Sequence, residues 1–143
     1  SPETSYHFGC FFPWSVKENF DYKKTKMFFK WHPNGRTSET FTDYDSLDDK
    51  IDGLCYFMQF IKFGFCRASR DASRLVHNGQ MTRHNALEIA AKYEDEFPIE
   101  YFDKVLSFLD LTLPEFIELL DSHRNSEIWS CEGGTWTLKF SLE

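Results

Sequence analysis

The sequence has no closely spaced pair of cysteines. Its four cysteines, Cys10, Cys55, Cys66 and Cys131, lie far apart in a chain of 143 residues, and none belongs to a CxxC motif. The histidines do not show the spacing of a structural zinc site either. We therefore expect no structural metal and four free thiols, buried or half-buried, in a reducing compartment.

A long hydrophobic segment is also missing. The most apolar run, residues 54–65, is interrupted by Gln59, Lys62 and Gly64, so it is too short and too polar to span a membrane. No signal peptide, internal repeat or low-complexity segment is visible. The sequence predicts a soluble, cytoplasmic protein without a membrane partner.

Positive charge is scarce overall but concentrated in one segment. The chain holds 16 Lys and Arg against 23 Asp and Glu, a formal net charge of −7, which argues against a nucleic acid partner. Residues 62–84 nevertheless carry five Lys or Arg and one acid, whereas residues 85–127 carry eleven acids and three bases. A short basic segment inside an acidic chain suits a small anion better than a long polyanion.

Helix signals dominate what the sequence does contain. The 16 phenylalanines favour a compact body, because each aromatic side chain buries a large area. Helix starts are indicated by the capping pairs Ser15–Glu18, Ser46–Asp49 and Thr112–Glu115, and a further helix begins at Thr82. The predicted helices cover residues 16–29, 47–63, 68–77, 82–97, 98–110 and 113–124. Gly64 and Gly79 are placed to end the second and third of them.

The remaining segments predict a few extended elements. Residues 5–12 are typical of a short buried strand, residues 37–46 of a polar loop over the surface, and the residues around Gly133-Gly134 of a terminal β-hairpin. The expected fold is mainly α, a helical bundle with a short N-terminal strand and a C-terminal β-hairpin. An apolar first strand with nothing before it indicates that the chain is the back half of something larger.

The densest basic and hydroxyl cluster follows the most hydrophobic helix. In "FGFCRASRDAS", residues 63–73, the arginines Arg67 and Arg70 lie three apart, and Arg74 follows four residues later, so all three point one way on a helix. Guanidinium groups at a helix N-terminus bind phosphate or carboxylate well. The alternative is that Arg70 and Arg74 are surface residues paired with acids of the C-terminal half. Spacing alone favours the anion-binding site and the surface ion pairs equally.

Two other chemistries depend on single groups. Asp48 and Asp52 are four residues apart near the start of the predicted helix 47–63. The helix dipole stabilises negative charges at this position, and the alternative is that the two carboxylates bind Mg²⁺ beside a nucleotide. Cys66 lies between basic residues, which would lower the pKa of its thiol, but no accompanying triad pattern occurs.

Four ordered motifs carry a family resemblance: "DDKIDGL", "FIKFGFCRASRDAS", the Asn78-Gly79 turn before "MTR", and the closing "RNSEIW". With them, the stretch from Pro13 to Trp136 resembles the C-terminal half of the N-acetyl sugar amidotransferases. These are bacterial enzymes of lipopolysaccharide and surface-polysaccharide biosynthesis in the ATP-pyrophosphatase (PP-loop) superfamily.

The resemblance implies a reaction and its partners. Such enzymes use ATP and Mg²⁺ to activate the acetamido carbonyl of a sugar nucleotide or nonulosonate, as found in O-antigens, and ammonia then gives an acetamidino group. A glutaminase with a cyclase-like subunit supplies the ammonia. The nucleotide site belongs to an N-terminal PP-loop domain with a Ser-Gly-Gly loop that this sequence lacks, so we expect no activity and no cofactor for this chain alone.

The resemblance also assigns domains and site residues. Residues 1–45 would be the end of the α/β nucleotide-binding domain with a connecting loop, and residues 46–143 the helical C-terminal domain. The expected substrate- and phosphate-binding residues are Lys62, Arg67, Ser69, Asp71, Ser73 and Arg74, with Asp71 orienting the arginines. Cys66, Arg70 and Asn85 depart from the family pattern, which has glycine, an acid and glutamate there.

A second hypothesis makes the chain a non-catalytic interaction module. In that case the acidic helices of residues 85–127, with Glu115 and Glu118, dock the glutaminase partner, and the basic cluster is structural.

Overall fold

The computed structural model describes residues 4–140, and these divide after Lys30 into two compact units. The first unit holds a turn of 3-10 helix, Phe8–Cys10, and helix α1, Val16–Lys26, which begins where the Ser15 side chain accepts a hydrogen bond from the Glu18 N–H. The predicted strand over residues 5–12 is wrong. A strand needs a hydrogen-bonded partner, and among residues 4–140 the one sheet consists of β1 and β2; the aromatic side chains of residues 5–12 are exposed.

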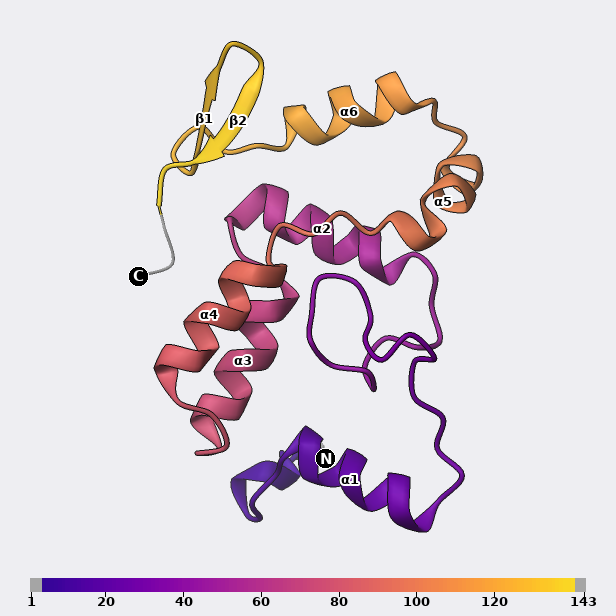
Figure 1. The fold of residues 1–143 in the computed structure, drawn as a ribbon, viewed down its shortest axis with the longest axis vertical. Coiled ribbons are helices and arrows are strands. Elements are labelled where there is room, and N and C mark those ends of the chain that lie inside the picture. The colour runs from indigo at the N-terminus through magenta and orange to yellow at the C-terminus, as the bar shows by residue number, and fades with distance from the viewer. Residues whose placement is uncertain (1–3, 141–143) are drawn as a thin grey trace. The chain divides into compact units, whose positions relative to one another are not determined.

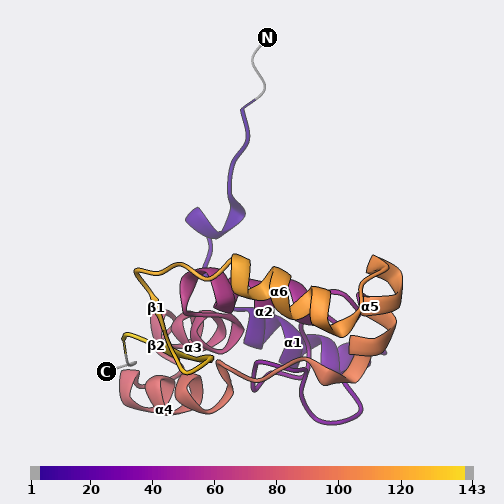
Figure 2. The same ribbon diagram turned by 90° about the horizontal axis from the view of Figure 1, so that it is seen from above.

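The second unit contains all the remaining elements (Figures 1 and 2). They are α2, Asp52–Phe63; α3, Arg67–His77; α4, Arg83–Tyr93; a 3-10 turn, Ile99–Tyr101; α5, Phe102–Leu109; α6, Leu113–Ser122; β1, Trp129–Glu132; and β2, Thr135–Leu138. The prediction of a mainly helical fold with a C-terminal two-stranded antiparallel hairpin is confirmed.

Helix α2 starts later than its sequence pattern predicts. Ser46 has a φ of +54°, and Asp49 Oδ1 accepts a hydrogen bond from the Ile51 N–H at 2.9 Å. A side chain that bonds its neighbouring backbone in this way competes with the first helical turn. The helix therefore begins at Asp52, and Leu47 is exposed.

The core surrounds helix α2. Its buried residues Leu54, Phe57, Phe60 and Ile61 pack with Phe116 and Leu120 of α6, Val105 of α5 and Trp129 of β1. The Trp129 indole crosses Phe60 edge to face at 5.3 Å and donates a hydrogen bond from Nε1 to the Ile61 carbonyl at 2.6 Å. This bond satisfies a carbonyl near the end of α2 and fixes the hairpin to the helix.

Two predicted helix ends are confirmed, as are the predicted starts at Thr82 and Thr112. Gly64 ends α2 in the left-handed conformation, and Gly79 adopts the same conformation after α3. Thr112 and Glu115 form the predicted capping box of α6. Helices α3 and α4 lie side by side (Figures 1 and 2) and are joined by the short turn that contains Gly79. This helical pair presents the basic cluster.

The four cysteines are free, as predicted, but only Cys66 is buried. No helix within residues 4–140 has the length and hydrophobicity needed to cross a membrane.

Gly64 and Gly79, two of the five described glycines with a positive φ, allow a matched test of packing. In Gly64→Ala the new Cβ would lie 3.0 Å from Ile128 Cγ2 and 3.1 Å from Leu138 Cδ2, whereas Gly79→Ala would meet no atom within 4 Å. Gly79→Ala should lower the free energy of unfolding by about 1–2 kcal/mol, from backbone strain alone. Gly64→Ala should lower it by about 2–4 kcal/mol, because overpacking is added. Denaturant titration measures both, and equal losses would contradict the packing of the hairpin on α2.

Candidate functional site

The N-terminus of α3 is closed by a carboxylate of the protein itself. Glu94, at the end of α4, accepts hydrogen bonds from the Cys66 N–H and, at 2.8 Å, from the Ser69 N–H. Helix N-termini present unpaired N–H donors and favour negative charge. Glu94 meets both needs, so this end of α3 offers no vacant backbone donors at Cys66 and Ser69 for an external phosphate.

The sequence predicts that the polar segment 37–46 is a loop over the surface. This prediction is wrong, because the segment is folded into the protein. Thr37, Glu39, Thr40 and Thr42 are buried. The Thr40 hydroxyl donates to Asp71 at 2.8 Å and the Glu39 N–H donates to the Glu96 carboxylate at 2.8 Å. Buried polar groups need such partners. The segment is therefore part of the interior, packed against α3 and the end of α4.

Arg67 points inward from α3. Its side chain is only 2% exposed, and its guanidinium donates to the Ser38 carbonyl at 3.3 Å and to the Asp45 carbonyl at 2.8 Å. The same group lies 4.8 Å from the centre of the Tyr56 ring. Because these contacts all come from segment 37–46 and α2, Arg67 lies away from the outer face of α3.

Asp71 forms ion pairs with Arg70 and Arg74, and its role in orienting arginines for a ligand stays a prediction. Its Oδ1 lies 3.1 Å from Arg70 Nε and 3.6 Å from Arg74 Nη1. Arg70 also pairs with Asp45 at 2.9 Å. The predicted alternative, that Arg70 and Arg74 pair with acids of the C-terminal half, is wrong, because their partners lie in α3 and in segment 37–46.

The outer face of α3 carries an open hollow of about 590 Å³. Three predicted site residues, Ser69, Ser73 and Arg74, line it together. Its other lining residues are Gln59, Phe65, Arg70, His77 and Asn78. Among the predicted site residues that do not line it, Asp71 is buried, Arg67 faces inward, and Lys62 is exposed near the end of α2. Ligand binding by any of the six stays a prediction.

The predicted magnesium ligands do not share a helix face. Asp48 lies before the start of α2, and Asp52 is its first residue, so the spacing of four residues does not bring the carboxylates together in the expected way. Within residues 4–140 no cluster of three or more His, Cys, Asp or Glu is arranged to hold a metal ion.

Cys66 is not an activated thiol. Burial, with the nearby Glu39 charge as the next cause, raises the pKa of Cys66 to about 12. Its Sγ lies 2.9 Å from the Tyr56 carbonyl and 3.9 Å from Glu39 Oε1. The basic neighbours in the sequence suggested a lowered pKa for this thiol. That interpretation is wrong, because the thiol is buried and lies near the Glu39 carboxyl group.

The residues that sequence reasoning missed are acids. Glu94 caps α3, and Glu96 forms a bidentate pair with Arg36, with both N–O distances at 2.6 Å. The Arg36 side chain donates additionally to the carbonyls of Thr37 and Thr40. In the sequence these acids belong to a uniformly acidic segment, and no local pattern separates them from solvent-exposed neighbours.

These elements define a helical domain whose basic helix is tied to the polar segment 37–46 by a buried hydrogen bond, Thr40 to Asp71, and by ion pairs to Asp45. The family model of the LPS biosynthesis protein WbpG-like C-terminal domain matches residues 38–142. The chain therefore belongs to the WbpG-like C-terminal domain family of lipopolysaccharide biosynthesis. No curated protein sequence matches it. The match covers segment 37–46 from its second residue, together with every element from α2 to β2.

We expect Glu39 to make the stability of the domain depend on pH. Its side chain is fully buried, and burial raises its pKa from 4.5 to about 8. Between those values the native state keeps a proton that the unfolded state loses, so the free energy of unfolding should fall as pH rises from 5 to 8, by up to about 1.4 kcal/mol per pH unit. Glu39→Gln should remove this slope in denaturant titrations, and Glu118→Gln, an exposed control, should retain it. Parallel profiles for wild type and Glu39→Gln would contradict the assignment.

Proposed function

We propose that this chain is the C-terminal part of an ATP-dependent amidotransferase that converts a sugar acetamido group to an acetamidino group in surface-polysaccharide biosynthesis. Its contribution is to bind the substrate or its phosphates on the outer face of α3. The observation that carries the proposal is the α3 hollow, where Ser69, Ser73 and Arg74 meet. Membership of the lipopolysaccharide biosynthesis family supports it.

The chemistry of the α3 hollow suits a phosphate. Two guanidinium groups and two hydroxyl groups line it, and no carboxylate does. Arg74 is 52% exposed and lies 3.6 Å from Asp71, so its donors are only loosely engaged within the protein. Guanidinium groups bind phosphate oxygens through paired, charge-assisted hydrogen bonds. Arg70 is more tightly held, because it pairs with both Asp45 and Asp71, so its guanidinium lines the hollow in a fixed position.

In this proposal the reacting groups lie outside the chain. ATP and Mg²⁺ belong to an N-terminal PP-loop domain, which supplies the activation of the acetamido carbonyl, and a glutaminase with a cyclase-like subunit supplies ammonia. Arg70, Arg74, Ser69 and Ser73 bind and orient the anionic part of the sugar substrate.

Arg74→Ala tests the assignment in an enzyme that carries this chain behind a PP-loop domain. With ammonium salt as the nitrogen source, the KM for the sugar nucleotide should rise about 10- to 100-fold, because a charge-assisted hydrogen bond contributes about 1.5–3 kcal/mol. Mass spectrometry of the acetamidino product measures it. Arg83→Ala, on neighbouring α4 and outside the hollow, is the matched control. An unchanged KM in Arg74→Ala would rule out the α3 hollow as the binding site.

A docking role for the acidic helices has one observation in its favour. Helices α5 and α6 expose large apolar side chains, among them Phe108, Leu113 and Ile117, and α6 also exposes the acid Glu118. Exposed apolar residues beside charged ones are typical of protein interfaces. We propose this surface for the glutaminase partner. It is compatible with substrate binding on α3.

Glu118→Lys tests the docking surface more cleanly than a change at Glu115, whose carboxylate caps α6 through Thr112. Reversal of the charge should weaken binding of the glutaminase at least about fivefold, because a like-charge contact disfavours association. Calorimetry or a pull-down measures it, with Glu132→Lys on the exposed hairpin as the control. Equal losses in both variants, or none, would exclude α6 as the docking surface.

A further inference from the structure

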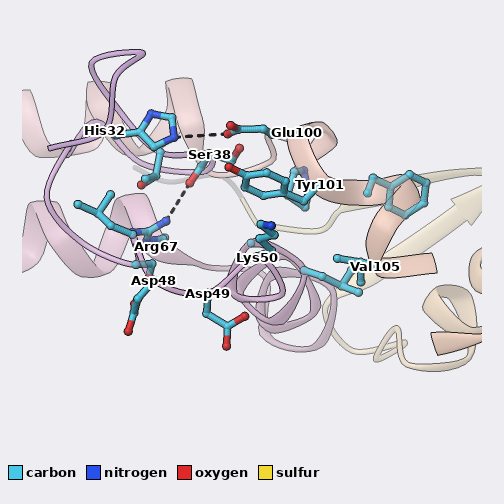
Figure 3. Close-up of a pocket in the computed structure, with 16 residues that line it drawn as sticks. His32, Ser38, Asp48, Asp49, Lys50, Arg67, Glu100, Tyr101 and Val105 are labelled. Atoms are coloured by element: carbon cyan, nitrogen blue, oxygen red, sulfur yellow. Dashed lines mark hydrogen bonds and ion pairs between the residues drawn. The ribbon is translucent and has the colours of Figure 1, made fainter. Parts of the chain in front are cut away.

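A second, more enclosed cavity lies on the inner side of Arg67. Its volume is about 130 Å³, and it lies between segment 37–50, the start of α2 and the region around Tyr101 (Figure 3). None of its lining residues belongs to the α3 hollow. The two are therefore separate sites.

Two buried polar groups of this cavity have no hydrogen-bond partner. They are the Nε–H of Arg67 and the Oγ1 of Thr37, and both residues line the cavity. A buried donor without a partner costs free energy, and buried polar groups are almost always paired. Both residues line the same cavity, and both groups are hydrogen-bond donors. The cavity thus offers two donors that the protein itself does not use.

Charge in the neighbourhood is also incompletely balanced. Three guanidinium groups, those of Arg67, Arg70 and Arg74, share the two carboxylates of Asp45 and Asp71. Arg67 has the longest of these ion pairs, 3.9 Å to Asp45. Glu39 does not compensate it at neutral pH, because burial raises the pKa of Glu39 to about 8. Of the three arginines only Arg67 lines the cavity, and its guanidinium is the positive group at the inner wall.

The rest of the lining defines what else a ligand must carry. Figure 3 shows Arg67 and Ser38 at one side of the cavity and Val105 at the other. Buried Leu54, Pro98 and Val105 make the second side apolar. The acids Asp48, Asp49 and Glu100 are exposed, and Glu100 lies 3.5 Å from His32 Nε2. The exposed part of the lining is therefore charged.

We propose that this cavity binds a small molecule that presents an oxygen acceptor, a carboxylate or an amide carbonyl, directly beside a small apolar group. The acceptor takes hydrogen bonds from Arg67 Nε–H and Thr37 Oγ1–H, and the apolar group packs on Leu54 and Val105. The proposal does not depend on the function of the α3 hollow, because Arg74 does not line this cavity and Thr37 does not line the hollow.

Acetate and acetamide are suitable probes, since each joins one acceptor group to one methyl group and they differ in charge. In NMR titrations of the full chain, at least one of them should give saturable shifts of the Arg67 Nε–H and Val105 methyl signals. Ligands of this size bind with dissociation constants on the order of millimolar. Preference for acetate identifies a carboxylate ligand, and preference for acetamide or equal binding identifies an amide. Saturable shifts for neither probe would overturn the proposal and leave a cavity that holds only water.

Thr37→Val is the decisive variant, because it removes the unpartnered hydroxyl and keeps the shape of the side chain. Its stability should be unchanged or higher, while binding of the preferred probe should weaken about 3- to 10-fold, as expected for one neutral hydrogen bond. Thr135→Val, on the exposed hairpin strand, should change neither. Binding by Thr37→Val at the wild-type affinity would contradict the assignment.

A second variant guards against a folding defect in Thr37→Val. Leu47 is exposed and lines the cavity, so Leu47→Trp should obstruct the mouth without disturbing buried groups and weaken probe binding at least about fivefold through steric exclusion. Unchanged probe affinity in Leu47→Trp would overturn the location of the site.

Discussion

The burial of the Arg67 guanidinium is the constraint on which the second unit depends. A buried charge is costly unless it is paired and hydrogen-bonded, and Arg67 obtains its partners from the carbonyls of Ser38 and Asp45. Those carbonyls are in place only because segment 37–46 enters the interior, where its threonines in turn bind Asp71. The loop, α3 and the end of α4 therefore form one connected polar network, and loss of any member would leave buried groups without partners.

This network also decides which charges remain available for function. Glu94 and Glu96 are used inside the domain, to cap α3 and to anchor Arg36. Arg67 is used inside as well, apart from its Nε–H. On its outer face α3 exposes Arg74 beside Ser69 and Ser73. On its inner side Arg67 lines the enclosed cavity together with Thr37. One helix thus separates two candidate binding sites, one open and basic, the other small and half apolar.

Local sequence signals predicted the elements well where the cause is local. Thr112 and Glu115 are three residues apart, and Gly64 and Gly79 need only their own backbone conformation, so capping and helix ends could be assigned from the sequence. The start of α2 was predicted too early, because the Asp49 side chain bonds the Ile51 backbone instead of allowing a helix from Leu47. The strand predicted for residues 5–12 failed because a strand needs a partner, and none is present in the described part of the chain.

The sequence by itself determined the helices, the terminal hairpin and the concentration of arginine on α3. Only the tertiary structure decided which of those arginines faces outward and which acids are internal. The physical reason is the sequence separation of the pairs: Arg36 and Glu96 are 60 residues apart, Thr40 and Asp71 are 31, and Ser69 and Glu94 are 25. Periodicity within a helix places Arg67, Arg70 and Arg74 on neighbouring positions, but the depth of each depends on a loop folded against them. The predicted cluster is therefore divided, with Arg74 in the open hollow and Arg67 at the enclosed cavity.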